Sequence, residues 1–202
     1  MDNPARTAEY LARQAARRAA LRAQLSSIIV DNKRVTWELG CGHGHFLTSY
    51  AKAHPDLTCL GIDIIAERIE RAEKKRKRAD LANLHFILAE ARLFLGELPA
   101  NTHLGDVFIL FPDPWPKARH HKHRIIQEDF LTELGQKASA DTRLCFRTDY
   151  KPYFDEAAAR IGSHPAWTVS DEAWPFEFET VFQSRAPAHY SLIARRRTPS
   201  IS

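Results

Sequence analysis

The feature that most constrains the fold is a regular alternation of short apolar segments with longer amphipathic ones. The apolar segments predict strands at residues 34–39, 57–64, 84–88, 106–111 and 142–147. The amphipathic segments predict helices at residues 46–53, 66–78, 91–98, 125–134 and 152–161. Strands that alternate with helices imply βαβ units with right-handed crossovers. We therefore expect an α/β fold with a doubly wound, mostly parallel sheet, in which residues 177–182 and 190–194 pair as antiparallel edge strands.

Length and composition agree with one domain of ordinary size. The chain has 202 residues, of which 44% are hydrophobic and 27% are charged, and such values are typical of globular domains. We expect a single domain over residues 1–202 that begins with an Arg-rich helix at about residues 7–25. The net charge of +4 is small, so an argument for nucleic-acid binding must depend on where the cations cluster.

Cysteine usage and hydropathy indicate the compartment. Cys41, Cys59 and Cys145 form no CxxC pair and are odd in number, which is unlike a secreted disulfide framework. No segment is apolar over the length of a membrane span, and the first residues lack the apolar region of a signal peptide. These features predict a cytoplasmic protein without a membrane partner. They leave a monomer and a homodimer equally open.

A glycine-rich turn follows the first predicted strand, with glycines at positions 40, 42 and 44. Glycine permits positive φ angles and close approach of the backbone to a ligand, although a tight strand-to-helix turn explains the pattern about as well. Asp63 ends the next predicted strand, where a carboxylate can accept hydrogen bonds from two ribose hydroxyls. Glu90 ends the third predicted strand, at the expected edge of an adenine pocket.

The spacing of these glycines favours one class of nucleotide ligand. The turn reads GxGxG and not the GxGxxG of dinucleotide folds, and Glu38 stands just before it. A pyrophosphate would meet the Glu38 anion, whereas a ligand with an amino group and a sulfonium would be attracted to it. S-adenosylmethionine therefore fits the turn, and NAD and an oxidoreductase activity fit poorly. The alternative is that Glu38 and Asp63 only cap helices.

A proline-rich loop follows the fourth predicted strand. Asp113 lies between Pro112 and Pro114, and Trp115 follows. A rigid carboxylate beside an indole suits a flat purine, while a purely structural loop is the alternative. The basic run at residues 117–124 then favours phosphate binding, and its three histidines lack the partners of a metal site, so we expect no metal. Another basic run, at residues 68–78, belongs to a predicted helix, and most of its charges are expected to face water.

Three segments together carry a resemblance to a known family: residues 38–44, 111–120 and 146–150. In this combination the chain resembles the tRNA (guanine-N7-)-methyltransferases, which have the Rossmann-like fold of S-adenosylmethionine-dependent methyltransferases. The resemblance implies that Glu38, Asp63, Glu90 and the glycines Gly40, Gly42 and Gly44 hold S-adenosylmethionine. It places Asp113 where cofactor and guanine meet. It further implies that the substrate, a guanosine in the variable loop of tRNA, contacts Lys117, Asp149, Thr180 and Gln183.

The chain departs from the family pattern in its last segment. Gln183 stands where the family has a glutamate, and the glycine-containing continuation expected after Arg185 is absent from the sequence. Charge-assisted hydrogen bonds are about twice as strong as neutral ones, so glutamine should bind guanine more weakly. Two alternatives therefore stay open: a methyltransferase for another RNA position, and a methyltransferase-fold RNA-binding protein with impaired catalysis.

The expected chemistry needs no general base, because guanine N7 carries a lone pair in the neutral base. Most of the acceleration should come from positioning two bound partners. Asp113 is then expected to orient the guanine and to stabilise the positive charge that methylation leaves on the ring.

Overall fold

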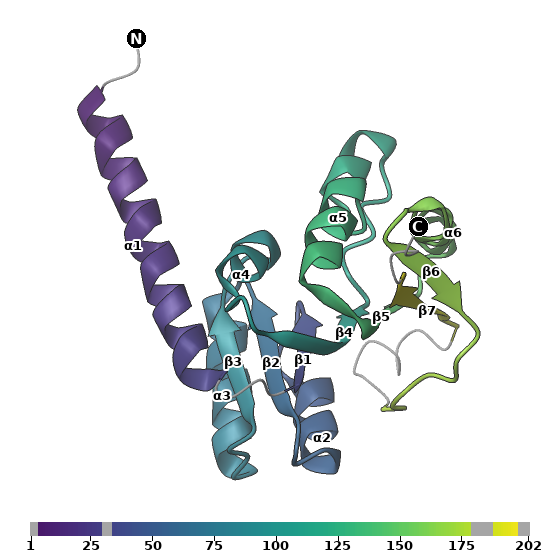
Figure 1. Ribbon diagram of the computed structural model, residues 1–202, viewed down its shortest axis with the longest axis horizontal. Coiled ribbons are helices and arrows are strands. Elements are labelled where there is room, and N and C mark those ends of the chain that lie inside the picture. Colours follow the sequence, from purple (N-terminus) through teal and green to yellow (C-terminus); the bar gives the residue numbers. More distant parts are fainter. Residues whose placement is uncertain (1–3, 30–33, 179–187, 198–202) are drawn as a thin grey trace.

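The computed structural model describes residues 4–29, 34–178 and 188–197 of the chain. Its centre is a seven-stranded sheet with the strand order β3-β2-β1-β4-β5-β7-β6 (Figure 1). The first five strands are parallel, and β7 runs antiparallel to both of its neighbours, β5 and β6. The strands are β1 (Arg34–Leu39), β2 (Thr58–Asp63), β3 (Leu84–Leu88), β4 (His103–Leu110), β5 (Ala138–Thr148), β6 (Trp167–Ser170) and β7 (Tyr190–Arg196). The expected doubly wound, mostly parallel sheet is confirmed.

The helices follow the predicted order, with differences at their ends. They are α1 (Pro4–Ile28), α2 (His45–Ala53), α3 (Ala66–Arg78), α4 (Ala91–Glu97), α5 (Glu128–Lys137) and α6 (Lys151–Ser163), with a 3₁₀ helix, η1 (Ala118–His123), that the sequence did not predict. Helix α5, predicted to begin at residue 125, begins three residues later. Ile126 is fully buried and its N–H donates to the hydroxyl of Tyr153 in α6, so this N–H is bound outside the helix, which begins after Gln127.

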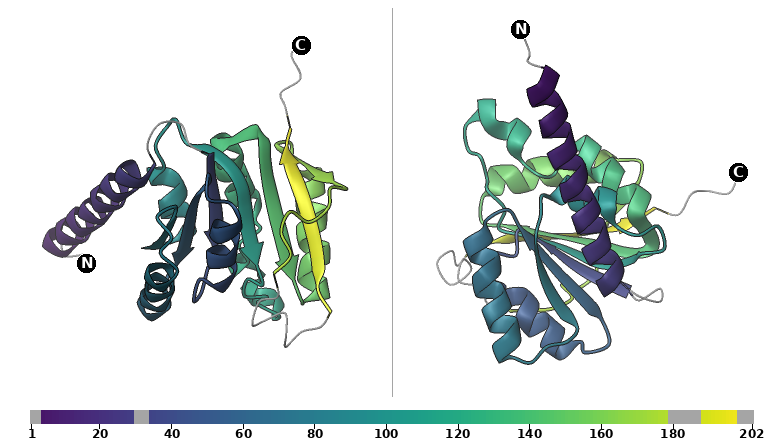
Figure 2. Two further views of the ribbon diagram at one scale, coloured as in Figure 1. Left: turned by 90° about the horizontal axis from the view of Figure 1, so that it is seen from below. Right: turned by 90° about the vertical axis from the view of Figure 1, so that its left-hand side faces the viewer.

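Side chains that alternate along the strands build a core on each face of the sheet. Val107 and Ile109 of β4 join the cluster formed with α4, α5 and α6, whereas Phe108 between them joins the cluster formed with α2 and α3. Figures 1 and 2 show α2 and α3 on one side of the sheet and α4 to α6 on the other.

One half of the α2–α3 face is covered by an irregular segment and not by a helix. Trp174, Phe176 and Phe178 pack there against the aromatic side chains of Phe46 and Phe108. The prediction of an edge strand at 177–182 was wrong for Glu177 and Phe178, which lie in this segment, and residues 179–182 lie outside the described residues. The edge strand beside β7 is instead β6, whose Trp167 is fully buried.

Helix α1 begins far from the sheet and reaches it only with its last turns (Figure 2). Leu21 and Leu25 are buried, while nearly every side chain from Arg6 to Ala20 is exposed. The guanidinium groups of Arg18 and Arg22 each lie 2.7 Å from a carboxylate oxygen of Glu97, whose side chain is fully buried. These ion pairs attach α1 to α4. Among the described residues, no helix is both long enough and apolar enough to cross a membrane.

Candidate active site

The glycine-rich turn connects the carboxyl end of β1 to α2, at the edge of the sheet where ligands bind in open α/β folds. Gly40, Gly42 and Gly44 all have positive φ angles, of 71°, 53° and 68°. A Cβ atom on Gly44 would lie 2.4 Å from the ring of Phe86 and 2.9 Å from Cβ of Ala72. The same atom on Gly40 or Gly42 would meet nothing within 4 Å. Gly44 thus packs the turn against the protein, and the other two glycines leave open space above it.

Asp63 lies at the carboxyl end of β2, beside this turn, as predicted. Its carboxylate accepts hydrogen bonds from the backbone N–H groups of Gly42, at 3.1 Å, and Ile65, at 2.9 Å. The guanidinium of Arg68 lies 3.4 Å from it. Because a carboxylate has about four lone-pair positions, it can still accept bonds from a ligand. Asp63 is only 4% exposed, and it connects the glycine turn to the start of α3.

Glu38 occupies the buried side of the turn and is only 4% exposed. Its pKa is raised to about 8, chiefly by burial and also by the nearby Asp63, although a backbone hydrogen bond from Leu47 and the charge of Lys75 act in the opposite direction. Oε2 of Glu38 has no hydrogen-bond partner among the described residues. Both Glu38 and Asp63 contact the start of a helix, as the capping alternative supposed. The unpaired buried oxygen is not explained by capping, because such an atom is costly unless a donor or a cation binds it.

Glu90 lies near the same edge, but not at the end of β3 as expected. The strand ends at Leu88, and Glu90 directly precedes α4. Its side chain is 64% exposed and lies 3.3 Å from the guanidinium of Arg17 in α1. Helix α1 therefore reaches the side of the site where the sequence placed the adenine.

The proline-rich loop leaves β4 with a reversal of the backbone. Phe111 has a φ angle of 48° and its N–H donates to the carbonyl oxygen of Arg147 on β5, at 2.8 Å. Asp113 and Lys117 are exposed. Among the described residues, neither side chain has a hydrogen-bond partner or an ion-pair partner. The loop thus presents both predicted side chains to solvent at the carboxyl edge.

Asp149 lies at this edge too, one residue beyond the end of β5, and it is exposed. Because Leu110 pairs with Arg147 in the parallel register of β4 and β5, the segments that carry Asp113 and Asp149 leave the sheet from neighbouring strands. Thr180 and Gln183 lie outside the described residues. The structure therefore brings the described members of the predicted site to one edge of the sheet.

Arg124 is a residue that the sequence analysis misjudged, because it was assigned to an exposed phosphate-binding run. Its side chain is 1% exposed and ion-paired with Glu156. Its Nε donates to the carbonyl oxygen of Pro114 at 2.9 Å and its Nη2 to that of Trp115 at 3.4 Å. The guanidinium also lies 4.8 Å from the ring centroid of Tyr153. Arg124 holds the loop around Asp113 from inside, and only its position before the apolar pair at 125–126 hinted at burial.

Arg147 has a similar function on the next strand, although the sequence assigned a function only to Asp149 in that motif. Its two terminal nitrogens each donate to the carboxylate of Glu177 at 3.0 Å, and its Nε donates to Ser191 at 2.7 Å. Its guanidinium lies 4.1 Å from the ring centroid of Trp174. Arg147 therefore fastens the segment that precedes the predicted substrate residues Thr180 and Gln183.

Two other kinds of chemistry find no support in the described residues. Among them no group of three or more His, Cys, Asp or Glu side chains has the geometry of a metal site. All three cysteines are buried and free. Burial raises the pKa of the Cys41 thiol and raises that of Cys59 to about 12, so these two thiols stay protonated at neutral pH.

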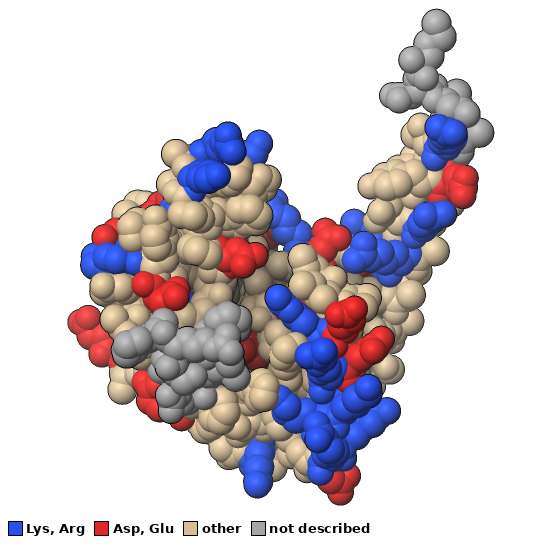
Figure 3. Space-filling model, turned by 180° about the vertical axis from the view of Figure 1, so that it is seen from behind, with Lys and Arg blue, Asp and Glu red and all other residues tan. Residues whose placement is uncertain are grey.

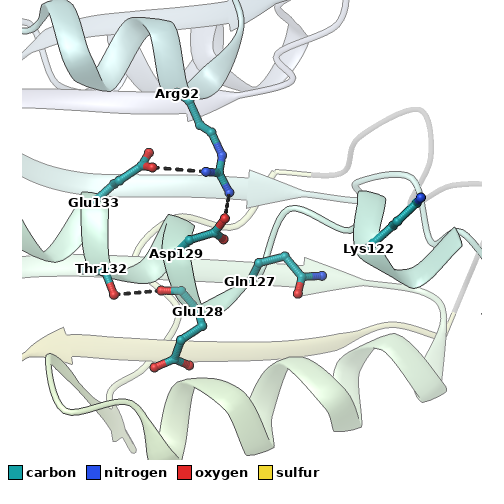
Figure 4. A pocket seen from close by; sticks show the side chains of 7 residues that line it. All are labelled: Arg92, Lys122, Gln127, Glu128, Asp129, Thr132 and Glu133. Carbon is teal, nitrogen blue, oxygen red and sulfur yellow. Dashed lines mark hydrogen bonds and ion pairs between the residues drawn. The ribbon is translucent and has the colours of Figure 1, made fainter.

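A pocket of about 650 Å³ lies apart from the predicted site residues, between α4, η1 and α5 (Figure 4). Arg92 crosses it and pairs with Glu133, at 3.1 Å, and with Asp129. The other lining residues are Lys122, Gln127, Glu128 and Thr132. None of the predicted site residues lines this pocket, and its arginine is already neutralised by two carboxylates.

Known proteins are similar to this chain in sequence. Residues 32–190 match the model of the Methyltransf_4 family, described as "Putative methyltransferase". A tRNA (guanine-N(7)-)-methyltransferase from Synechococcus sp. is 38% identical over 128 residues, which are 63% of this chain and 54% of that protein. Another, from Thermotoga maritima, is 30% identical over 177 residues, which are 85% of this chain and 56% of that protein. The chain thus spans about half the length of these curated relatives.

Solved structures agree on the fold. A protein described as an antibiotic-related methyltransferase has a TM-score of 0.60 and 21% sequence identity, and the match covers 87% of this chain and 93% of that one. At this identity the likeness shows the fold alone, which is the Rossmann-like one expected from the sequence. Since the family model covers well over half of the chain, the protein belongs to the Methyltransf_4 family, and its resemblance to the tRNA (guanine-N7-)-methyltransferases is confirmed.

Proposed function

We propose that the protein transfers the methyl group of S-adenosylmethionine to N7 of a guanosine in tRNA. The observation that carries the proposal is the open glycine turn beside Glu38, a buried carboxyl group with one unpaired oxygen. A cationic amino group would satisfy that oxygen, and a pyrophosphate would be repelled by it once ionised. The named activity of the relatives supports tRNA as the substrate and N7 as the methylated atom.

Each predicted cofactor residue has a distinct task in this proposal. Glu38 accepts the amino group, Asp63 accepts the ribose hydroxyls, and Gly40 and Gly42 leave room for the ligand beside the backbone. Glu90 lies at the adenine end of the site. Its carboxylate contacts either the ligand in place of Arg17, or the ligand and Arg17 together. S-adenosylmethionine, when bound, supplies an electrophilic methyl group on a sulfonium.

The substrate residues orient the guanine and hold charge. Asp113 and Asp149 follow neighbouring strands, so two carboxylates can face the N1–H and N2–H₂ donors of one guanine. Lys117 adds a cation for a phosphate, and Thr180 and Gln183 are the remaining proposed contacts. N7 attacks with its own lone pair, so no residue has to remove a proton first. Positioning two reactants can lower a barrier by up to about 7–11 kcal/mol, and the carboxylates stabilise the cationic product.

The test is methyl transfer from labelled S-adenosylmethionine to tRNA that lacks N7-methylguanosine, followed by nucleoside analysis. Label in N7-methylguanosine supports the proposal. Label in another nucleoside identifies a methyltransferase for a different RNA position, and tRNA binding without transfer identifies an RNA-binding protein with impaired catalysis. Either of these results overturns the proposal.

A matched pair of variants tests Asp113. Asp113→Asn should lower single-turnover transfer at saturating tRNA by about 100-fold, as expected when an electrostatic group is lost from a reaction centre, with cofactor affinity retained. Asp56→Asn changes an exposed carboxylate before β2, at the opposite edge of the sheet, and should leave transfer unchanged. Full single-turnover transfer by the Asp113 variant would show that this carboxylate does not act on the guanine.

The proposal also places the protein in the cytoplasm, where tRNA is modified. The three free cysteines agree with a reducing compartment.

A further inference from the structure

The positive charge of the chain is concentrated on one helix. Thirteen residues of α3 contain seven Lys or Arg and three Glu, a net charge of +4, which equals the net charge of the whole chain. The other 22 cations and 22 anions cancel. Figure 3 shows these blue side chains gathered at the lower right, over α3.

Three of the seven cations of α3 bind an acidic side chain or another segment of the chain. Arg68 pairs with Asp63, and Arg76 pairs with Glu73. The Nζ of Lys75 donates to the carbonyl oxygen of His43 in the glycine-rich turn, at 2.9 Å. These three side chains are therefore used for the fold or for the site.

The other four cations form a basic ridge, which we define as Arg71, Lys74, Lys77 and Arg78. All four are exposed, and none has a carboxylate oxygen within 4.0 Å among the described residues. The Nε of Arg78 donates to the carbonyl oxygen of Lys74, one turn back in the same helix, at 3.3 Å, which leaves its charge without an acidic partner. At 100° per residue they lie opposite the buried stripe that contains Ile69 and Ala72. The ridge thus points away from the protein over about 10 Å of helix axis.

Local effects account for only part of this charge density. A glutamate stands four residues before each of Arg71, Lys74 and Lys77, a spacing that stabilises a helix by about 0.2–0.5 kcal/mol per pair, but Arg78 has no such partner. A helix dipole favours cations in the last turn, but neighbours three and four residues apart in the ridge repel each other. Burial and the charge of Arg78 lower the pKa of the adjacent Lys75, in agreement with this crowding. The cations of α1 differ, because Arg17, Arg18 and Arg22 are paired with Glu90 or Glu97.

We infer that the basic ridge of α3 is a second RNA-binding surface, which binds backbone phosphates of the substrate away from the target guanosine. Arg78 lies about 18 Å along the helix axis from the start of α3 at the carboxyl edge. A folded tRNA spans this distance, whereas a nucleoside does not. The inference rests on the proposed function for the identity of the RNA. It changes the sequence-based expectation that these charges only face water.

The experiment compares tRNA affinity at 50 and 200 mM salt for three proteins. The ridge variant carries Lys74→Gln, Lys77→Gln and Arg78→Gln, since glutamine preserves helix propensity. The control variant carries Arg6→Gln, Arg13→Gln and Lys52→Gln, three exposed cations of α1 and α2. Binding of S-adenosylmethionine and the unfolding temperature are measured for each, to show that the fold and cofactor site are intact.

Three phosphate contacts contribute about 2 to 3 to the slope of log affinity against log salt concentration. Over this fourfold salt range, the wild type should therefore lose about 20- to 40-fold more tRNA affinity than the ridge variant. The control variant should keep the slope of the wild type. An unchanged slope in the ridge variant overturns the inference. The inference is also overturned if the slope falls equally in the ridge variant and the control variant. It is overturned as well if, in a parallel assay with anionic lipid vesicles, the ridge variant loses binding to the vesicles but not to tRNA.

Failure of this inference and failure of the proposed function give different results. If the wild type methylates tRNA and the ridge variant binds it with an unchanged slope, only the inference fails. If the wild type transfers no methyl group to tRNA, the proposed function fails, and the comparison of slopes still decides the inference.

Discussion

Arg124 provides a sharp test of how the loop around Asp113 is held. Arg124→Met removes the guanidinium and keeps a stem of similar length. The change deletes two hydrogen bonds from a charged donor to the carbonyl oxygens of Pro114 and Trp115, and such bonds contribute about 1.5–3 kcal/mol each. It also breaks the ion pair with Glu156, which is 26% exposed and keeps Arg160 as a partner at 3.1 Å, so this loss is small. We expect the free energy of unfolding to fall by about 3–5 kcal/mol.

The same change should lower activity in a protein that is still folded. Without Arg124, about two residues of the loop regain backbone freedom, and ordering them again costs about 1–2 kcal/mol each. This cost predicts a decrease in kcat/KM of about 30- to 1,000-fold, with S-adenosylmethionine affinity unchanged because the cofactor residues lie on other loops. The assays are urea unfolding, calorimetry with the cofactor, and methyl transfer to tRNA at a temperature where the variant is folded.

Arg160→Met is the matched control. Arg160 binds the same carboxylate from within α6 but makes no recorded contact with the loop. This variant should lose little stability and keep full transfer. If Arg124→Met were destabilised by the expected amount and still transferred methyl groups as fast as the wild type, the loop would be ordered without Arg124 and the reasoning would be wrong.

Two further predictions concern the glycine-rich turn. Glu38 has a folded-state pKa of about 8 against 4.5 for the ordinary group, so the ligand-free protein should lose stability as the pH rises from about 5 to 8. Glu38→Gln should remove most of this pH dependence, as measured by urea unfolding at pH 5, 6.5 and 8. Equal pH profiles for both proteins would contradict the assignment. Gly44→Ala should destabilise by at least about 2 kcal/mol, because its Cβ would lie 2.4 Å from Phe86 at a positive φ angle. Gly96→Ala in α4, where the atom nearest to an added Cβ is Nη2 of Arg18 at 3.7 Å, should instead be neutral or stabilising by about 0.5–1 kcal/mol in the same assay. A similar loss of stability in both variants would refute the packing argument.

The spacing of apolar residues predicted the bounds of the elements whose ends depend on nearby residues alone. Strand β1, strand β3 and helix α3 begin and end where the apolar periodicity placed them. The start of α5 was wrong because a hydroxyl from α6, 27 residues away, binds the backbone of Ile126. The edge strand was wrong because Arg147 and the aromatic core hold residues 174–178 across the sheet. Contacts between distant segments decided both cases.

The predicted site residues came from motifs, and a motif records which side chains occur together but not what holds them in place. Asp63 and Glu38 stood beside a glycine turn in the sequence and do so in the structure. Arg124 and Arg147 stood in the same motifs without an assigned function. Their partners, among them Glu156 and Glu177, are about 30 residues away, a separation that carries no local signal.

The sequence by itself determined the alternation of the first five strands with the helices, the glycine turn, the membership of a methyltransferase family and the set of carboxylates at the sheet edge. These features depend on periodicity and on residue type at short spacing. Only the tertiary structure decided what each arginine does. Arg124 and Arg147 are buried and bind carbonyl and carboxylate oxygens, Arg18 and Arg22 attach a helix, and Arg71 and Arg78 are exposed on α3 without an acidic partner among the described residues. In the sequence all of them are the same cation, and burial and the nearest oxygen, which only the folded chain supplies, make them different.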